Sequence, residues 1–532
     1  MKGIETKPSE INLISFLNNE DAKASLKDIH RGIERELVRT TLHGSLSDQP
    51  HPSALGSALT HPYITTDFAE AQLELVTPAM NNRQAMFKML GSLHHFVAAQ
   101  IQPSETLWGS SMPPVLPDED AITIANYGSS NAGKLKMRYR QGLANRYGKH
   151  MQLISGIHYN FSLPTSFWEA LHIYANSPLM LSDFISERYF HLIRNVLRYG
   201  WIIPYLFGAS PAVDRSYLVT DEHDLKTLDD ETYYLPWATS LRLSNMGYSS
   251  TEQSLFPMSF NSKQEYLTDL CRALTQPSER YTHLSADKQL NTSVLQLENE
   301  LYGSIRPKIV SSELRPLMAM CHKGVQYIEL RSLDNNPYLP LGISAEQSQF
   351  LDLFLTYSAL APSPDITDVE RSLIIRRQEL VATQGRKPGL KLPTLQGEFP
   401  LVDLGEKFLM AMQPIADSFD SAFLTHSYTK SIAREKAKFD NSNLTPSAQV
   451  LADMNKEQLS HTKLVQRLSM QHAKVHQQSH IASEEKEKLI KLAEESRLAQ
   501  EKMESQQDVS FEEFIQKKSR LQCDCGPQEV MV

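Results

Sequence analysis

The sequence lacks the features of secreted, membrane-spanning and nucleic-acid-binding proteins. Only four of its 532 residues are cysteine, far fewer than a disulfide-rich secreted protein carries. No segment approaches the ~20 apolar residues that a transmembrane helix needs, and residues 1–18 contain no apolar run of signal-peptide length. The formal net charge of −9 argues against a dedicated nucleic-acid binder. We therefore expect a cytoplasmic protein with neither a membrane nor a nucleic-acid partner.

The common phosphate-binding and hydrolase motifs are also missing. The sequence has no G-x-x-x-x-G-K-[ST] loop, no G-x-G-x-x-G after a strand and no G-x-S-x-G elbow. A bound nucleotide would therefore be held mainly through metal ions and scattered basic residues.

Two glutamates one residue apart stand in a segment near the N-terminus, residues 32–38, that has the character of a strand. Side chains alternate between the two faces of a strand, so Glu34 and Glu36 share a face. Two carboxylates roughly 7 Å apart repel each other and are costly to bury without a cation. The segment alone is consistent with a solvent-exposed strand face and with a metal site.

Three further segments combine an apolar face with a polar face. They are residues 65–76 with Gln72 and Glu74, residues 156–162 with His158, Asn160 and Ser162, and residues 326–331 with Glu329 and Arg331. Four such strands indicate a sheet that packs on helices with one side and lines a cavity with the other. Carboxylates with one histidine suit Mg²⁺ or Mn²⁺, and an arginine beside a ligand glutamate suits phosphoryl transfer.

Two runs combine aromatic residues with a single arginine: residues 139–143 with Arg140, and residues 233–243 with Arg242. Arginine binds carboxylates in a bidentate manner, and aromatic walls suit a small, partly apolar substrate. Taken alone, however, either arginine is more often a surface or ion-pair residue, so its role stays open at this point.

Helical periodicity appears between these segments, without the regular strand–helix alternation of a doubly wound sheet. The helices that we expect cover approximately residues 10–30, 83–100, 167–171, 180–199 and 263–274.

The sequence changes character from about Thr445, where aromatic residues become scarce. Residues 475–507 carry one narrow, mostly apolar stripe at helical spacing, which favours a helix packed along the rest of the protein. A coiled-coil partner helix is the alternative, but the heptad repeat is not sustained. Ser510 and Glu513 are typical of a capping box that opens one further short helix.

The four cysteines give no clear pattern. Cys271 and Cys321 are isolated, and Cys523 and Cys525 form a C-x-C pair near the end. The pair lacks nearby histidines and a second cysteine pair, which disfavours a zinc site. We expect a flexible or redox-exposed tail.

Six segments match one known family in their order along the chain. They are Arg31–Glu36, Ala54–Thr60, Ile64–Glu70, Ile157–Pro164, Pro204–Pro211 and Tyr327–Leu333. They resemble bacterial glutamate–cysteine ligase (γ-glutamylcysteine synthetase) of the enteric type, over about residues 10–440. We therefore expect a catalytic domain over residues 1–444 and a charged helical C-terminal extension over residues 445–532.

The resemblance implies an α+β fold similar to that of glutamine synthetase, with a curved antiparallel sheet flanked by helices. It also implies the reaction: ATP-dependent ligation of the γ-carboxylate of L-glutamate to the amine of L-cysteine through γ-glutamyl phosphate. This is the first step of glutathione biosynthesis, with ATP as co-substrate and Mg²⁺ or Mn²⁺ as cofactor.

The resemblance further implies the site residues. The metal ligands are expected to be Glu36, Asp67 and Glu74 in one site, and Glu34, His158 and Glu329 in a second site facing the ATP phosphates. Arg331 is expected to steady the transferring phosphoryl group. The expected substrate-binding residues are Phe68, Tyr139, Arg140, Arg242, Tyr248 and Tyr302.

Three alternatives remain at this point. The first is a related carboxylate–amine ligase with another amine acceptor, and the second is a non-catalytic protein that kept the fold. The second is disfavoured because all six expected metal positions carry suitable side chains. We expect a monomer, and self-association through the C-terminal helices is the third alternative.

Overall fold

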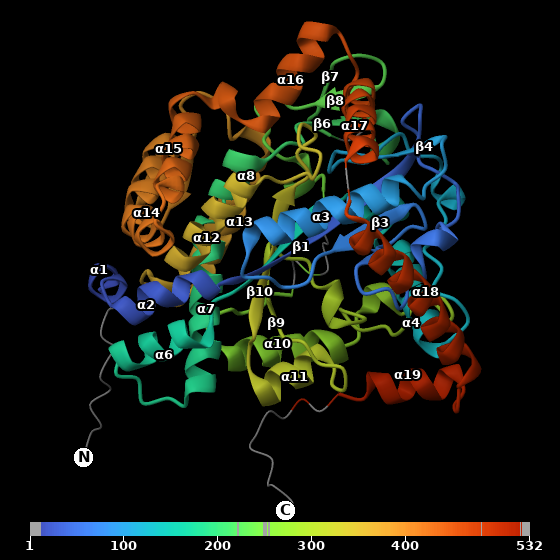
Figure 1. The fold of residues 1–532 in the computed structure, drawn as a ribbon, viewed down its shortest axis with the longest axis horizontal. Helices are drawn as coiled ribbons and strands as arrows, with labels where there is room; N and C mark the ends of the chain where they lie inside the picture. The colour runs from blue at the N-terminus through green and yellow to red at the C-terminus, as the bar shows by residue number, and fades with distance from the viewer. Residues whose placement is uncertain are drawn as a thin grey trace, which may run out of the picture.

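A seven-stranded antiparallel sheet forms the centre of the protein (Figure 1). The computed structural model describes residues 12–220, 223–247, 253, 256–479, 481–521 and 523. The strand order is β2-β3-β1-β5-β10-β9, and β4 also pairs with β1. The strands are β1 (His30–Thr41), β2 (Ile64–Thr66), β3 (Gln72–Val76), β4 (Glu105–Leu107), β5 (Gly156–Ser162), β9 (Ile305–Lys308) and β10 (Tyr327–Asp334).

The sheet register collects the polar side chains on one face. Glu34 on β1 stands opposite His158 on β5, and Glu36 stands opposite Glu74 on β3. Because successive side chains alternate along each strand, the partners of these residues on neighbouring strands face the same way. The predicted polar face is therefore present in the described part of the sheet.

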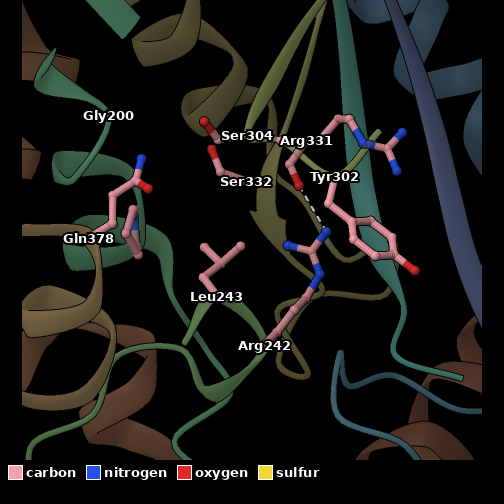
Figure 2. A pocket seen from close by; sticks show the side chains of 10 residues that line it. Gly200, Arg242, Leu243, Tyr302, Ser304, Arg331, Ser332 and Gln378 are labelled. Carbon is pink, nitrogen blue, oxygen red and sulfur yellow. Dashed lines mark hydrogen bonds between the residues drawn. The ribbon is translucent and has the colours of Figure 1, made fainter. Parts of the chain in front are cut away.

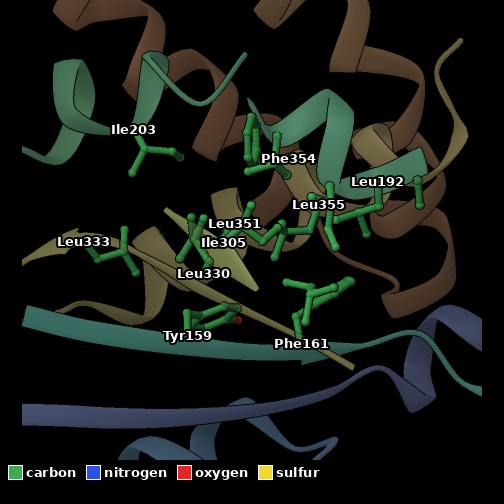
Figure 3. Close-up of a cluster of buried hydrophobic side chains, with 14 of the residues drawn as sticks. Tyr159, Phe161, Leu192, Ile203, Ile305, Leu330, Leu333, Leu351, Phe354 and Leu355 are labelled. Carbon is green, nitrogen blue, oxygen red and sulfur yellow. The ribbon is translucent and has the colours of Figure 1, made fainter. Parts of the chain in front are cut away.

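The opposite face of the sheet is mostly apolar and is buried under helices, although Arg31 and Arg35 of β1 also lie on it. Tyr159, Phe161 and Leu330 point from β5 and β10 toward Leu351 and Phe354 of helix α12 (Ala345–Leu360), in a cluster that Figure 3 shows. Burial of this face supplies the main driving force for folding, since each fully buried aliphatic or aromatic side chain contributes about 1.5–3 kcal/mol.

Helices surround the sheet (Figure 1). In chain order they are α1 (Leu13–Leu17), α2 (Glu20–Ser25), α3 (Arg83–Ala98), α4 (Asn131–Tyr147), α5 (Lys149–Gln152), α6 (Thr165–Tyr174), α7 (Leu181–Tyr199), α8 (Ile202–Phe207), α10 (Lys263–Thr275), α11 (Pro316–Lys323), α12 (Ala345–Leu360), α13 (Asp368–Gln384), α14 (Leu401–Phe423), α15 (Ser427–Asp440), α16 (Pro446–Glu457), α17 (His461–Gln478), α18 (Ser483–Ser505) and α19 (Phe511–Ser519). Two small sheets pair β6 (Ala212–Asp214) and β7 (Lys226–Thr227) with β8 (Thr232–Tyr234), and β11 (Lys391–Thr394) with β12 (Gly397–Pro400).

Two sequence predictions differ from the structure. Residues 10–30 do not form one helix, because the Asn19 side chain accepts hydrogen bonds from two backbone N–H groups and starts α2 anew after α1. Residues 65–76 form a hairpin of β2 and β3 rather than one strand. The backbone N–H of Asp67 donates to the carbonyl of Gln72, which closes the turn. The helices expected near residues 83, 167, 180 and 263 are confirmed.

The C-terminal helices pack against the rest of the protein. Helix α17 contacts α3 and β4, α18 contacts α3, and α19 contacts α4. Leu489, Ala493 and Ser496 of α18 are buried, which agrees with the packed helix that the apolar stripe predicted. Ser510 accepts a hydrogen bond from the Glu513 backbone and caps α19. The domain boundary at residue 444 stays a prediction.

Two further features concern the whole described chain. No helix in its described ranges is long and apolar enough to cross a membrane.

Cys271 on α10, which is isolated in the sequence, forms a disulfide with Cys523 beyond α19.

Candidate active site

The polar face of the sheet lines a cavity of about 390 Å³. Its walls come from β1, β2, β3, β5, β9 and β10 and from one face of α4. All six expected metal ligands line this cavity: Glu34, Glu36, Asp67, Glu74, His158 and Glu329. The structure thus brings together residues that are almost 300 positions apart in the sequence.

His158 lies at the centre of the acidic cluster. Its Nδ1 is 3.3 Å from Glu34 Oε2 and 3.8 Å from Glu329 Oε1, and its Nε2 is 3.5 Å from Glu36 Oε1. One potential ligand atom from each of Glu34, Glu74 and His158 lies within 4.8 Å of the others. The two predicted metal sites divide this group, because they assign Glu74 to one ion and Glu34 and His158 to the other. This division stays a prediction.

The electrostatics of the cluster are uneven. Burial raises the pKa of Glu74 well above its ordinary value, and the neighbouring carboxylates, Glu34 first among them, raise it further. Burial also raises the pKa of Glu36. Although burial acts in the same direction on Glu329, Lys308 and other nearby cations hold the pKa of Glu329 well below its ordinary value. On the Glu74 side of the cluster, the nearby positive charge of Lys136 is therefore too weak to offset burial and carboxylate repulsion.

The residues present fit a divalent cation. Carboxylate oxygens with one imidazole are the donor set that Mg²⁺ and Mn²⁺ prefer. Glu329 Oε2 is buried and makes no hydrogen bond within the described ranges, and Glu74 carries no positive partner strong enough to offset its burial. A cation would give Glu329 Oε2 a partner and would offset the repulsion that raises the pKa of Glu74.

The raised pKa of Glu74 gives a stability prediction. The folded protein without metal holds the Glu74 proton more tightly than the unfolded chain does. That contribution to stability is complete below the ordinary pKa of 4.5 and is lost as the pH rises through the raised value. We expect the Glu74→Gln variant, which cannot ionise, to be more stable than the metal-free wild type at pH 8, by ~1.4 kcal/mol for each unit of the pKa rise.

Thermal unfolding in a metal chelator at pH 5 and pH 8 measures this effect. The gain in melting temperature should be present at pH 8 and small at pH 5. Glu169→Gln, at an exposed position on α6, is the matched control and should show no gain at either pH. A Glu74→Gln variant less stable than the wild type at pH 8 would contradict the repulsion inferred here.

Arg331 extends from β10 into the same cavity. Its Nη1 lies 3.4 Å from Glu329 Oε2 and 3.2 Å from the Nδ1 of His158. The backbone carbonyl of Arg331 accepts a hydrogen bond of 2.8 Å from Nη2 of Arg242, which Figure 2 shows. The expected catalytic arginine therefore lies beside two of the expected metal ligands.

Arg331 and Tyr302 also border a second cavity of about 240 Å³ (Figure 2). Arg242 lines it and is buried, with Nη1 3.6 Å from Asp334 Oδ1. Gly156 allows this approach, because a Cβ there would lie 2.0 Å from the Arg242 guanidinium. The two cavities thus meet at the arginine expected to act in catalysis.

Aromatic side chains line the first cavity at the end formed by α4. Phe68, Tyr139 and Tyr302 all border it, and Tyr302 accepts a hydrogen bond from Gln152. Arg140 borders it as well and donates to the backbone carbonyl of Asp67. The remaining expected wall residue, Tyr248, lies outside the described residues.

Three cations of the cavity were not identified from the sequence: Lys136, Arg306 and Lys308. Lys308 Nζ is 3.4 Å from Glu329 Oε1, and Arg306 Nη1 is 4.0 Å from Glu329 Oε2. Residues 305–308 alternate a basic residue with Ile or Pro, which is a usable strand signal, but the segment is too short for the pattern to stand out.

Comparisons with known proteins agree on one family. The family model described as glutamate–cysteine ligase matches residues 14–381. The chain is 42% identical to the glutamate–cysteine ligase of Saccharophagus degradans over 511 residues, which are 94% of this chain and 96% of that protein. It is also 42% identical to that of Azotobacter vinelandii over 512 residues, with the same coverage.

A solved structure gives the same result. The crystal structure of glutamate–cysteine ligase from Francisella tularensis in complex with AMP superposes with a TM-score of 0.87 at 31% identity. The match covers 92% of this chain and 97% of that one. The likeness extends over residues beyond 444, because less than a tenth of the chain is left out.

Proposed function

The chain belongs to the glutamate–cysteine ligase family, and we propose that it joins the γ-carboxylate of L-glutamate to the amine of L-cysteine at the expense of ATP. The products are γ-glutamylcysteine, ADP and phosphate, and the reaction begins glutathione biosynthesis. The observation that carries the proposal is one cavity that holds all six expected metal ligands together with Arg331.

The metal-binding role falls to the acidic cluster. Glu36, Asp67 and Glu74 are proposed to hold one Mg²⁺ or Mn²⁺ ion, and Glu34, His158 and Glu329 a second one nearer the ATP phosphates. Such ions neutralise the phosphate oxygens and orient ATP for transfer. Five of the six ligands stand on strands of the sheet, which gives the ions a rigid support, and Asp67 lies in the turn between β2 and β3.

Arg331 is proposed to neutralise charge on the transferring group. A γ-carboxylate oxygen of glutamate attacks the γ-phosphorus, ADP leaves, and γ-glutamyl phosphate forms. The neutral amine of cysteine then attacks the acyl carbon, and phosphate leaves with the former carboxylate oxygen. The fixed guanidinium stabilises charge in the first step without any reorganisation.

The α4 end of the cavity is proposed to bind the amino acids. Phe68, Tyr139 and Tyr302 provide apolar walls for a small side chain. Arg140 at this end, and Arg242 in the adjoining second cavity, provide charge for a carboxylate or phosphate. Enclosure of both substrates orients them and protects the acyl phosphate from water. Binding of Tyr248 to substrate stays a prediction, as do the cytoplasmic location and the monomeric state.

A phosphate-release assay tests the proposal. With ATP, Mg²⁺ and L-glutamate, addition of L-cysteine should raise the release of ADP and phosphate many-fold, with stoichiometric γ-glutamylcysteine. A panel of other amino acids at equal concentration tests the alternative of a different amine acceptor. Preference for another amine, with no response to cysteine, would overturn the assignment of cysteine but not that of the ligase chemistry.

A further inference from the structure

The end of the chain crosses the loops that lead into the active site. We name residues 483–521 together with Cys523 the C-terminal strap; it contains α18 and α19. Ser496 Oγ accepts a 2.9 Å hydrogen bond from the Ser57 backbone, and the Ser496 carbonyl accepts one of 2.5 Å from Thr60 Oγ1. Glu504 Oε1 accepts a 2.8 Å hydrogen bond from the Ser129 backbone. The strap therefore holds two separate loops.

The packing of the strap on these loops is close. Gly56 has a φ of +85°, and a Cβ at this position would lie 2.8 Å from the backbone of Ala493. Ser496 is 3% exposed, and the Gln500 side chain accepts a hydrogen bond from Ser57. Such complementarity distinguishes a built contact from a helix lying loosely on a surface.

Both loops lead directly to the walls of the substrate end. The first loop continues into β2, and Asp67 and Phe68 follow that strand. The second continues into α4, which carries Lys136, Tyr139 and Arg140. None of the α18 contacts described above reaches these residues, so α18 acts on them through the loops, whereas α19 contacts α4 directly.

Tyr127 couples the two loops to each other. Its hydroxyl donates a 2.7 Å hydrogen bond to the carbonyl of Thr66, the residue before Asp67. Lys136 and Arg140 both lie over its ring, at 4.8 and 4.6 Å from the ring centre. A displacement of the second loop would thus shift both walls of the substrate end.

The far end of the strap is fastened covalently. Asn131 donates to the carbonyl of Val509, and Arg138 lies 5.5 Å from the ring centre of Phe511. Beyond α19, Cys523 is bonded to Cys271 of α10, with a Cα–Cα distance of 5.9 Å and a sequence separation of 252. This distance is typical of disulfides, and the bond closes a large loop across the molecule.

We propose that the C-terminal strap positions the substrate end of the active site, and that the Cys271–Cys523 disulfide is a clasp that makes this positioning respond to thiols. The inference rests on the proposed function. In thiol–disulfide exchange, two molecules of a small thiol break the S–S bond, Cys271 and Cys523 become thiols, and the reductant becomes its own disulfide. Release of the clasp loosens the strap and weakens binding of the amino acids, whereas ATP binding is unaffected.

The positioning role is tested by removing the contacts of α18 with the loops. In the Gln500→Ala/Glu504→Ala variant we expect the KM for glutamate and cysteine to rise about 3–10-fold, because the loops need to be ordered on binding. The KM for ATP should not change. The matched control is Lys491→Ala/Glu495→Ala, which removes an exposed i,i+4 ion pair of the same helix and should leave all three constants unchanged.

Hydrogen exchange gives a readout that does not depend on activity. Residues 57–67 and 127–140 should lose protection in the Gln500→Ala/Glu504→Ala variant and keep it in the control. Unchanged KM values together with unchanged exchange in an active variant would overturn the positioning role. Failure of the ligase assignment is distinguishable, because the wild type would then release no phosphate in response to glutamate and an amine.

The clasp is tested with dithiothreitol. Peptide mapping of the denatured, alkylated protein should show Cys271 joined to Cys523, and dithiothreitol should remove this link. L-2-aminobutyrate replaces cysteine in this assay, so that the acceptor brings no thiol. Reduction should raise the KM for the amino acids in the wild type to the value of the Cys523→Ser variant, which should not respond. Free thiols with stoichiometric bound zinc, or wild-type KM values insensitive to reduction, would overturn the clasp.

Discussion

The Glu36→Gln variant is expected to lose ligation, by about 10³-fold or more in kcat/KM, while the protein stays folded. Glu36 faces the centre of the cavity from β1, and its Oε1 lies 3.5 Å from His158 Nε2. Glutamine keeps the shape of the side chain but removes the negative charge that binds a divalent cation. Because burial disfavours the ionised form of Glu36, its replacement should not reduce stability in the absence of metal.

Steady-state kinetics at saturating Mg²⁺ and a metal-binding titration measure the two expected losses. Glu169→Gln is again the control, since that side chain is exposed on α6 and does not line the cavity. Circular dichroism and a melting curve report folding. Wild-type turnover in a folded Glu36→Gln variant would contradict the assignment of Glu36 as a metal ligand.

The Arg331→Met variant is expected to lower kcat about 10³-fold, with smaller changes in the KM values. The side chain of Arg331 lies beside Glu329 and His158, where charge on a transferring phosphoryl group would develop. Methionine fills similar space but supplies no positive charge. Arg331→Lys should recover part of the rate, because lysine restores the charge without the planar, bidentate guanidinium.

Single-turnover measurements with ATP and glutamate separate phosphoryl transfer from product release. Arg376→Met, at a position where 63% of the side chain is exposed, is the matched control. A loss confined to KM, with kcat unchanged, would make Arg331 a residue of uniform substrate binding rather than one that stabilises the transition state.

The polar face of the sheet was predictable because alternation is a strictly local signal. Glu34 and Glu36 on β1, His158 on β5 and Glu329 on β10 each have an apolar neighbour in the sequence, and the structure places all four on one cavity. Asp67 was different. The hairpin turn that carries it was not distinguishable from a continuous strand, and only the family resemblance assigned it to the site.

Other features depend on contacts between distant segments and have no local signal. The coupling of Tyr127 to Thr66 and the contacts of Ser496 with Ser57 arise from tertiary packing. The bond between Cys271 and Cys523 likewise joins segments 252 residues apart. The spacing of four cysteines allows several pairings, so it could not indicate this one.

In the proposed mechanism, the γ-carboxylate of glutamate is activated by phosphorylation. Measuring whether one of its oxygens ends in the released phosphate tests this activation most directly. L-glutamate labelled with ¹⁸O in its γ-carboxylate is incubated with ATP, Mg²⁺ and cysteine, and the released phosphate is analysed by mass spectrometry. Formation of γ-glutamyl phosphate predicts one ¹⁸O atom in each phosphate released, since the amine displaces the former carboxylate oxygen together with phosphorus. Unlabelled phosphate, released in step with γ-glutamylcysteine, would contradict this mechanism.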